Sequence, residues 1–510
     1  MAEPSSPAPS RRDAAAASPR AGEPDRQHAW LIAAMIVTFM LVNYADKSVL
    51  GLAAVPIMDE LGISNSAYGM VSSSFSLLFS LSGLAVGFVS ARVSSRVLLF
   101  GMAVVWAVAQ LPVLFVASVP ALVAGRVLLG AAEGPAASMS MHALYKWFPA
   151  DRRGLPSALQ IGGAALGTMV AAPAVTGLIS AFGWRSAFLA LAVLSLVWAL
   201  AWWRIGHDGP YGETGTATAE VSGRLPYRRL LLNGTVLGSI AGAFGGSWAL
   251  ALSHAWLPAY LRTQLDMAPG TAATLISAVS AFSLVLLLSV PQLLDALRRR
   301  GLAVRWSHGI PQGIAVAVAA LAMTALPFVD ARGAHLALLA VAFGGHAIVF
   351  PLHYMTTSAV VPPLQRGAVF GIVAASGTLP GLLAPYLTGH LLDSAPSRNA
   401  GYTHAFLLSG GVMLVCGLVS LLTVRPDRDA RRLGPDAGRP DGDARRPAPD
   451  AGRPDGDARR PAPDAGRPDE DARPPAPDAG RPDEDARPPG PSARRRVRSA
   501  QRPDEDPQDA

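Results

Sequence analysis

The chain has few of the residues on which secreted proteins and soluble enzymes depend. Among its 510 residues there is one cysteine, Cys416, which excludes a disulfide framework and a cluster of thiols for metal or redox chemistry. Only 15% of the residues are charged, whereas 51% are hydrophobic, so the chain is too apolar for an ordinary soluble protein. The sequence contains no nucleotide-binding loop, metal-ligand spacing or catalytic triad pattern. We therefore expect neither an enzyme nor a cofactor.

The apolar residues form long blocks rather than stripes. A helix needs about 20 apolar residues to cross a bilayer, and many blocks reach that length. They predict an all-α membrane protein with about twelve transmembrane helices. The expected spans are 30–54, 67–90, 97–118, 121–147, 155–181, 185–204, 230–257, 269–293, 306–328, 334–358, 367–392 and 402–424.

The spans divide into two sets of six. Residues 29–204 and 230–424 form the two halves, and a polar linker at 205–229 separates them. Segment 1–28 lacks an apolar core followed by a cleavage site, so it reads as a disordered cytoplasmic N-terminus and not as a signal peptide. Repeated halves with a site between them at mid-membrane are an architecture suited to alternating access.

The basic residues predict how the chain is oriented. The net charge of +7 could indicate a nucleic-acid partner, but the basic residues fall in short clusters between apolar blocks. Such clusters mark the cytoplasmic side of a membrane protein. They favour a multi-pass protein of the cell inner membrane with both termini in the cytoplasm. The expected partner is the lipid bilayer and not nucleic acid.

The composition changes completely after residue 424. Four copies of a fourteen-residue unit rich in proline, aspartate and arginine begin at Pro435, Pro449, Pro463 and Pro477. This composition cannot bury enough apolar surface to offset the entropy of folding, so we predict a disordered tail at 425–510. A tether or partner-binding arm is one interpretation. A repeat expansion with no role is the interpretation we favour.

Four ionisable residues lie inside predicted spans, where each costs about 2.5 to 3.5 kcal/mol to insert. Asp46 and Lys47 lie in the first span, and Arg126 and Glu133 lie in the fourth, two helical turns apart on one face. A purely structural set of ion pairs is the alternative, but buried pairs stabilise poorly compared with apolar packing. We favour function, because a buried carboxylate can take or release a proton when a neighbouring cation moves.

Five stretches carry a resemblance to a known family. The chain resembles the major facilitator superfamily, and within it the anion:cation symporter branch of hexonate, hexuronate and sialin-like carriers. The stretches are NYADK at 43–47, GRVLLGAAEG at 125–134, WFPADRRG at 147–154, WLPAYL at 256–261, and RGAVFG at 366–371 followed by Gly381 and Pro385.

The resemblance implies a secondary active transporter that takes up a small organic anion, such as a monocarboxylate or sugar acid, with protons as the coupling ion. It implies that Asp46 and Glu133 carry protons. It also implies that Tyr44, Lys47 and Arg126 belong to the substrate site, with Arg126 a partner to Glu133. Lys47 stands where the branch more often has arginine, so the bidentate fork that suits a carboxylate is lost.

The resemblance also identifies candidate gating residues at the cytoplasmic ends of the helices: Arg92, Arg96, Asp295 and Arg299. Ala91 stands where the gating motif usually has aspartate. Ala164 stands where sugar-acid carriers often offer an amide, and a buried hydroxyl without a partner is costly. A less hydroxylated monocarboxylate, such as an aromatic one, therefore becomes the favoured substrate.

Other interpretations stay open. An anion exchanger or efflux carrier would share the fold, and a non-transporting membrane receptor or scaffold could signal through the tail. The histidines His142, His254, His346 and His353 lie in or near spans. We expect them at helix ends or facing a cavity rather than in a proton relay.

Overall fold

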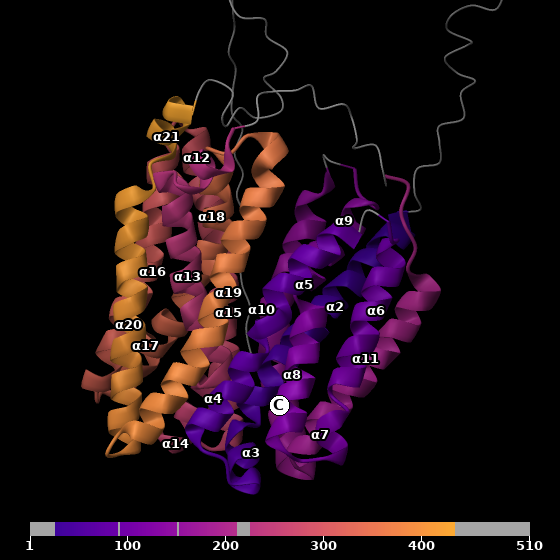
Figure 1. Ribbon diagram of the computed structural model, residues 1–510, viewed down its shortest axis with the longest axis vertical. Coiled ribbons are helices and arrows are strands. Elements are labelled where there is room, and N and C mark those ends of the chain that lie inside the picture. Colours follow the sequence, from indigo (N-terminus) through magenta and orange to yellow (C-terminus); the bar gives the residue numbers. More distant parts are fainter. Residues whose placement is uncertain (1–25, 90–91, 150–151, 212–224, 434–510) are drawn as a thin grey trace, which may run out of the picture. The chain divides into compact units, whose positions relative to one another are not determined.

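The computed structural model describes residues 26–89, 92–149, 152–211 and 225–433 (Figure 1). Within these ranges the regular structure is helical, and none of the described residues forms a strand. The segment up to residue 25 and the repeats from residue 434 onward lie outside the described residues. The predictions made for those two segments therefore stay predictions.

Ten helices lie in the described residues of the first half, several of which follow one another almost without a gap. They are α2 (Arg26–Leu52), α3 (Ala54–Leu61), α4 (Asn65–Ser74), α5 (Ser76–Val89), α6 (Ser95–Ala109), α7 (Pro112–Phe115), α8 (Val119–Glu133), α9 (Ala136–Tyr145), α10 (Gly154–Phe182) and α11 (Trp184–Ile205).

The second half begins with the short α12 and ends with the short α21. Its elements are α12 (Tyr227–Leu231), α13 (Gly234–Ala255), α14 (Leu257–Thr263), α15 (Pro269–Arg299), η2 (Arg305–Gly309), α16 (Ile310–Ala325), η3 (Leu326–Phe328), α17 (Arg332–Gly344), η4 (Gly345–Ile348), α18 (Val349–Ser358), α19 (Pro363–Ser394), α20 (Arg398–Thr423) and α21 (Pro426–Leu433).

Ten helical segments within the described residues are long and apolar enough to cross a membrane. The two expected spans that do not reach this length are both divided. The span expected at 67–90 is split at Phe75 into α4 and α5, and the span expected at 121–147 is split at Gly134 and Pro135 into α8 and α9. Proline has no N–H to donate to the helix ladder, which explains the second break.

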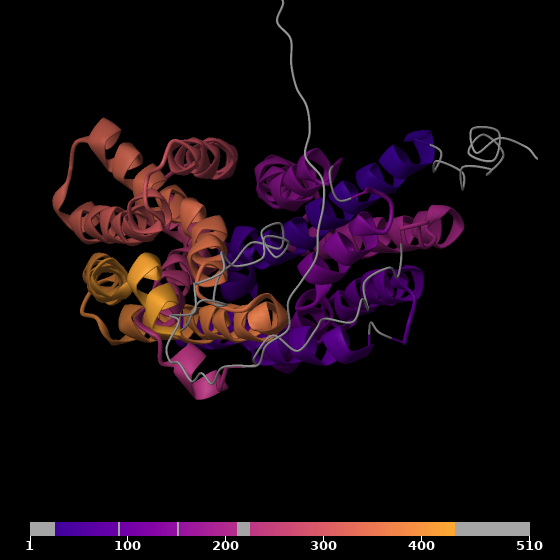
Figure 2. The ribbon, with the colours of Figure 1, turned by 90° about the horizontal axis from the view of Figure 1, so that it is seen from above.

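Each half has its own packed interior. In the first half α2 packs against α10, and α6 packs against α11; in the second half α13 and α16 pack against α20. Figure 2 shows the two sets of helices, indigo to magenta and pink to yellow, gathered as two groups. An aromatic cluster forms part of the first interior, where the Phe39 ring lies 4.4 Å from Trp106 and 4.7 Å from Trp198, between ring centroids.

The halves meet along α4 with α19 and along α10 with α15. Near the α3 end, the Asp393 carboxylate of α19 accepts hydrogen bonds from the backbone N–H groups of Asn65 and Ser66, at 3.1 and 2.7 Å. The side chains of these two residues also donate to Asp393. Because Asn65 and Ser66 begin α4, the carboxylate caps this helix from the opposite half.

The tail prediction is wrong for its first residues. Pro426–Leu433 forms α21, and Asp429 in this helix is buried against the start of α13. Its Oδ2 accepts hydrogen bonds from the backbone N and the hydroxyl of Thr235, at 3.0 and 2.7 Å. These bonds satisfy donors at a helix N-terminus, which is why the ordered second half extends beyond residue 424.

Candidate functional site

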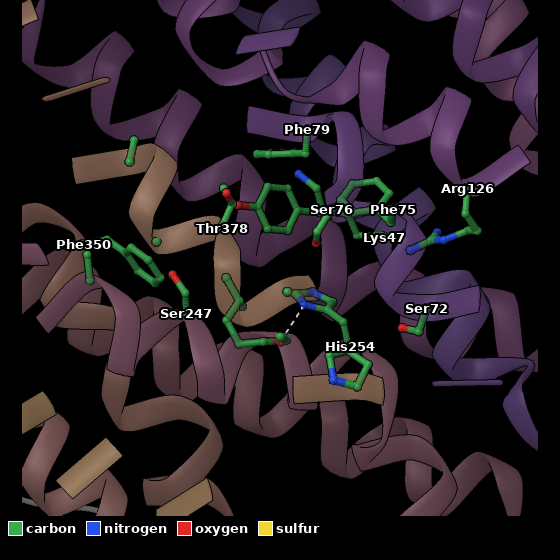
Figure 3. Close-up of a pocket in the computed structure, with 18 of the residues that line it drawn as sticks. Lys47, Ser72, Phe75, Ser76, Phe79, Arg126, Ser247, His254, Phe350 and Thr378 are labelled. Atoms are coloured by element: carbon green, nitrogen blue, oxygen red, sulfur yellow. Dashed lines mark hydrogen bonds between the residues drawn. The ribbon is translucent and has the colours of Figure 1, made fainter. Parts of the chain in front are cut away.

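A cavity of about 340 Å³ lies between the two halves, within the range of volumes that small-molecule sites have. Figure 3 shows Arg126 and Ser72 of the first half on one side and Ser247 and Phe350 of the second half on the other. The lining residues that matter below are Tyr44, Lys47, Phe75, Phe79, Arg126, Ser247, His254, Phe350, His353, Tyr354 and Thr378. They come from α2, α5, α8, α13, α18 and α19, with Phe75 at the break between α4 and α5.

Lys47 links the cavity to a carboxylate behind its wall. Its Nζ lies 3.3 Å from Oε2 of Glu133 on α8 and donates a 2.7 Å hydrogen bond to Oδ1 of Asn43. The same ammonium lies 4.3 Å from the centroid of the Tyr44 ring, a cation–π distance. The Lys47 side chain is 16% exposed and lines the cavity, whereas that of Glu133 is 0% exposed and does not. Lys47 can therefore face either a ligand or Glu133.

Asp46 is fully buried and does not line the cavity. Its Oδ1 accepts a 2.8 Å hydrogen bond from Nε2 of Gln110, and its Oδ2 has no hydrogen-bond partner among the described residues. Gln110 caps the C-terminus of α6, where Pro112 opens the short α7. The break between α6 and α7 therefore positions the Gln110 side chain that donates a hydrogen bond to Asp46.

Arg126 is the second cation in the cavity wall. Its Nη1 donates to the backbone oxygen of Asp46 at 3.3 Å, and its guanidinium lies 4.7 Å from the centroid of the Phe75 ring. Its Nε is buried and has no hydrogen-bond partner in the part of the chain that the structure describes. Arg126 is thus held in place but not neutralised by a carboxylate, which suits the binding of an anion.

The partner of Glu133 differs from the one that the resemblance implies. Among the described residues, the ion pair of Glu133 is formed with Lys47 and not with Arg126. Arg126 and Glu133 are seven residues apart on α8, which separates them by about 10 Å along the helix axis. Lys47, projecting from α2, reaches Glu133 without crossing that distance.

Two glycines bring α8 close enough for this contact. A Cβ on Gly130 would collide with the backbone oxygen of Phe75, and one on Gly134 would collide with that of Phe79. Spacing of small residues by four is how membrane helices approach backbone to backbone. Glu133 lies between the two glycines, so the close packing of α8 on α4 and α5 fixes its position.

Of the four candidate gating residues, Asp295 and Arg299 pair with each other, and no described contact joins them to Arg92 or Arg96. Asp295 forms ion pairs within α15, at 3.0 Å to Arg298 and 2.5 Å to Arg299. Arg96 donates to the backbone oxygen of Trp203 on α11 and stacks on its ring, and Arg92 is exposed. None of these described contacts crosses between the halves, so a gating role stays a prediction.

Sequence reasoning left out several residues in and behind the cavity wall. Gln110 is a polar residue in an apolar run, which was a usable signal. The aromatic residues Phe75, Phe79 and Phe350 carry no such signal, because aromatics are common in any membrane helix. His254 and His353 face the cavity, as expected. The described residues contain no group of three histidine, cysteine, aspartate or glutamate side chains that could hold a metal ion.

Comparisons with known proteins agree with this geometry. The model of the Major Facilitator Superfamily matches residues 36–385 and 302–462. The chain is 24% identical to the hexuronate transporter of Bacillus subtilis over 395 residues, which cover 76% of this chain and 92% of that protein. It is also 24% identical to the D-galactonate transporter of Escherichia coli over 438 residues, covering 81% and 99%.

Solved structures show the same fold. A bacterial homologue of the human lysosomal transporter Spinster, in an inward-facing and unoccupied conformation, aligns with a TM-score of 0.67 at 16% identity, covering 82% of this chain and all of that one. The D-xylose–proton symporter aligns with a TM-score of 0.65 at 16% identity, covering 78% and 98%. The family match, the helical fold and the cavity between the halves lead to one conclusion: the chain belongs to the Major Facilitator Superfamily, whose members are multi-pass membrane transporters and not enzymes.

Proposed function

We propose that this protein is a proton-coupled symporter that takes up a small organic anion by alternating access. The single observation that carries the proposal is the Lys47–Glu133 pair in the wall of the central cavity. The cation faces the cavity and the carboxylate lies behind it. A proton on Glu133 would release Lys47 to bind a substrate carboxylate, and this competition couples the two events.

The substrate class follows from the charges of the cavity. Lys47 and Arg126 line it, while Asp46 and Glu133 do not. A substrate therefore meets two cations and no carboxylate from these four residues, which favours an anion such as a monocarboxylate or sugar acid. The relatives, which include hexuronate and galactonate transporters, support the same class.

The transport cycle would proceed in three steps. In the outward-open state Asp46 and Glu133 take up protons, and Lys47 and Arg126 bind the substrate carboxylate. The halves then rock about the site, so that the cavity opens to the cytoplasm. Substrate and protons leave, and Lys47 returns to Glu133. The Asp393 cap on α4 joins the halves at the α3 end, and this contact supports an inward-facing conformation such as that of the last step.

The membrane arrangement belongs to the proposal. The ten long apolar segments, together with α4–α5 and α8–α9 counted as one broken span each, make twelve. The basic clusters between spans put both termini in the cytoplasm of a cell inner membrane. The α3 end then faces outward.

The number of protons has an electrical consequence. One proton per monoanion is electroneutral, whereas two protons would move one net charge, worth about 2.3 kcal/mol per 100 mV. Asp46 and Glu133 allow the larger number. Uptake of a monoanion that ignores the membrane potential would exclude two protons.

The test is uptake of labelled organic acids into proteoliposomes with and without an inward proton gradient. We expect the native protein to accumulate at least one acid only with the gradient, and Glu133→Gln to lose that accumulation while still exchanging the acid. Exchange by both proteins with no gradient-driven accumulation in the native protein would instead support an anion exchanger, with Glu133 structural. Ser138→Ala, on α9 and outside the cavity lining, is the control.

A further inference from the structure

A second cavity of about 190 Å³ adjoins the central one, and we call it the side lobe. Four residues line both spaces: Tyr44, Leu250, His254 and Phe350. These four residues border the passage between the two spaces. Two of them, Tyr44 and His254, come from opposite halves, and their ring centroids lie 6.3 Å apart. Figure 3 shows His254 and Phe350 on the second-half side of the central cavity, where this passage begins.

The side lobe differs in chemistry from the central cavity. Its described lining contains no lysine, arginine, aspartate or glutamate. Apolar side chains such as Ile161, Leu287 and Phe343 form much of its wall. A second carboxylate would find no cation there, so the part of a substrate that enters the lobe is neutral.

The size and walls of the lobe suit a single ring. An apolar cavity of about 150 Å³ holds a benzene molecule, so 190 Å³ is sufficient for a substituted one. Tyr44 at the passage and Phe343 and Phe350 in the wall offer aromatic faces for such a ring. Lys47 lies 4.3 Å from the Tyr44 ring, so a carboxylate held by Lys47 stands next to the passage.

His346 is a polar residue in the wall of the lobe. It lies in η4, is 3% exposed, and its Nδ1 has no hydrogen-bond partner among the described residues. The other two cavity histidines differ, because Nδ1 of His254 and of His353 each bonds a backbone carbonyl four residues earlier, at 3.0 and 3.1 Å. Buried polar atoms usually have partners. The His346 ring is not held at Nδ1, so it can turn a nitrogen toward a ligand hydroxyl.

We propose that the side lobe is a substrate subsite, and that the transported anion is a hydroxyaryl monocarboxylate. Its carboxylate binds Lys47 and Arg126, its ring lies in the lobe beside Tyr44 and Phe350, and its hydroxyl meets His346. This inference rests on the proposed function, because it needs the carboxylate at Lys47. The lining of the lobe also includes Thr168, Ser253, Ser280 and Ser283, so a polyhydroxylated acid such as gluconate is the competing ligand that the test must include.

The test is binding of three acids to the purified full chain: 4-hydroxyphenylacetate, phenylacetate and gluconate. We expect 4-hydroxyphenylacetate to bind at least about tenfold more tightly than phenylacetate, because only the former has a hydroxyl for His346. His346→Phe should remove this preference, measured as the ratio of the two affinities within that variant. Ser138→Ala, outside the lining of both cavities, should keep it. The ratio of affinities within one variant does not depend on how much protein folds.

Three results would overturn the subsite: no binding of 4-hydroxyphenylacetate, tighter binding of gluconate, or a preference that survives in His346→Phe. The proposed function has a separate readout. Gluconate uptake that depends on the proton gradient would leave the symporter intact while the subsite fails. Binding of 4-hydroxyphenylacetate without any gradient-driven uptake would support the subsite and contradict the symporter.

Discussion

The Lys47 ammonium lies 3.3 Å from the Glu133 carboxylate and joins α2 to α8 at the wall of the central cavity. The pair is unequal, because the lysine side chain is 16% exposed and the glutamate is 0% exposed. The carboxylate is thus committed to this lysine, while the lysine can exchange its partner for a ligand. That inequality is the basis of the first prediction.

Removing one member of the pair should destabilise the protein more than removing both. Lys47→Met leaves a buried carboxylate without its cation, and we expect a loss on the order of 2 kcal/mol, reduced because Lys47 is partly exposed. The double variant Lys47→Met with Glu133→Leu should lose less than the sum of the single variants. Unfolding in detergent measures the coupling. Strict additivity would mean that the pair contributes nothing.

The Asp393 cap should hold the α3 end closed. Asp393→Asn keeps the shape but loses the charge that favours a helix N-terminus, so the open state becomes more populated. The reporter is Ser72→Cys, a cavity residue, in a Cys416→Ser background. A membrane-impermeant maleimide added on the α3 side should label it several-fold faster with Asp393→Asn. Equal rates would show that Asp393 does not control this end.

A substitution at Gly51 should open the α3 end by a steric clash between the halves. A Cβ at Gly51 would collide with the backbone oxygen of His254 in the other half. Gly51→Ala should therefore push the halves apart at the α3 end and raise labelling of Ser72→Cys. Gly101→Ala is the matched control, because nothing lies within 4 Å of its new Cβ. The control should keep the native labelling rate and gain about 0.5 to 1 kcal/mol of stability.

Gly130 should matter for the fold and the site together. Gly130→Ala places a methyl group against the Phe75 backbone within one half, and we expect a loss of about 1 to 3 kcal/mol. The displaced α8 would also move Glu133 away from Lys47, so gradient-driven uptake should fall. Thermal unfolding and uptake are measured on the same preparation. Native uptake in a destabilised variant would show that the packing at Gly130 affects stability without affecting proton coupling.

The tail gives a test by truncation. Removal of 434–510 should leave uptake unchanged, whereas removal from Pro426 onward also deletes α21 and the Asp429 bonds to Thr235. The longer truncation should lower the melting temperature and reduce uptake. Asp429→Ala reproduces the loss without a truncation. A receptor or scaffold that signals through the tail predicts the opposite, a phenotype from the shorter deletion that ignores Lys47 and Glu133.

The sequence by itself determined the class of the protein and the residues of the charged site. Apolar blocks of spanning length are dictated by the thickness of the bilayer, so they can be read directly, and an ionisable residue inside such a block stands out because of its cost. Asp46, Lys47, Arg126 and Glu133 were found in this way. The breaks in the second and fourth expected spans were not predicted, although Pro135 marks one of them.

The tertiary structure decided the pairing and the shape of the site. Which cation meets Glu133 depends on how closely α8 packs against its neighbours, and that depends on glycine contacts between helices far apart in the chain. The same holds for Gln110 on Asp46, Asp393 on α4, and His346 in the side lobe. Each of these relations joins residues from different helices, so helical periodicity carries no information about it. Composition and periodicity specify each helix, but only packing specifies which side chains face one another.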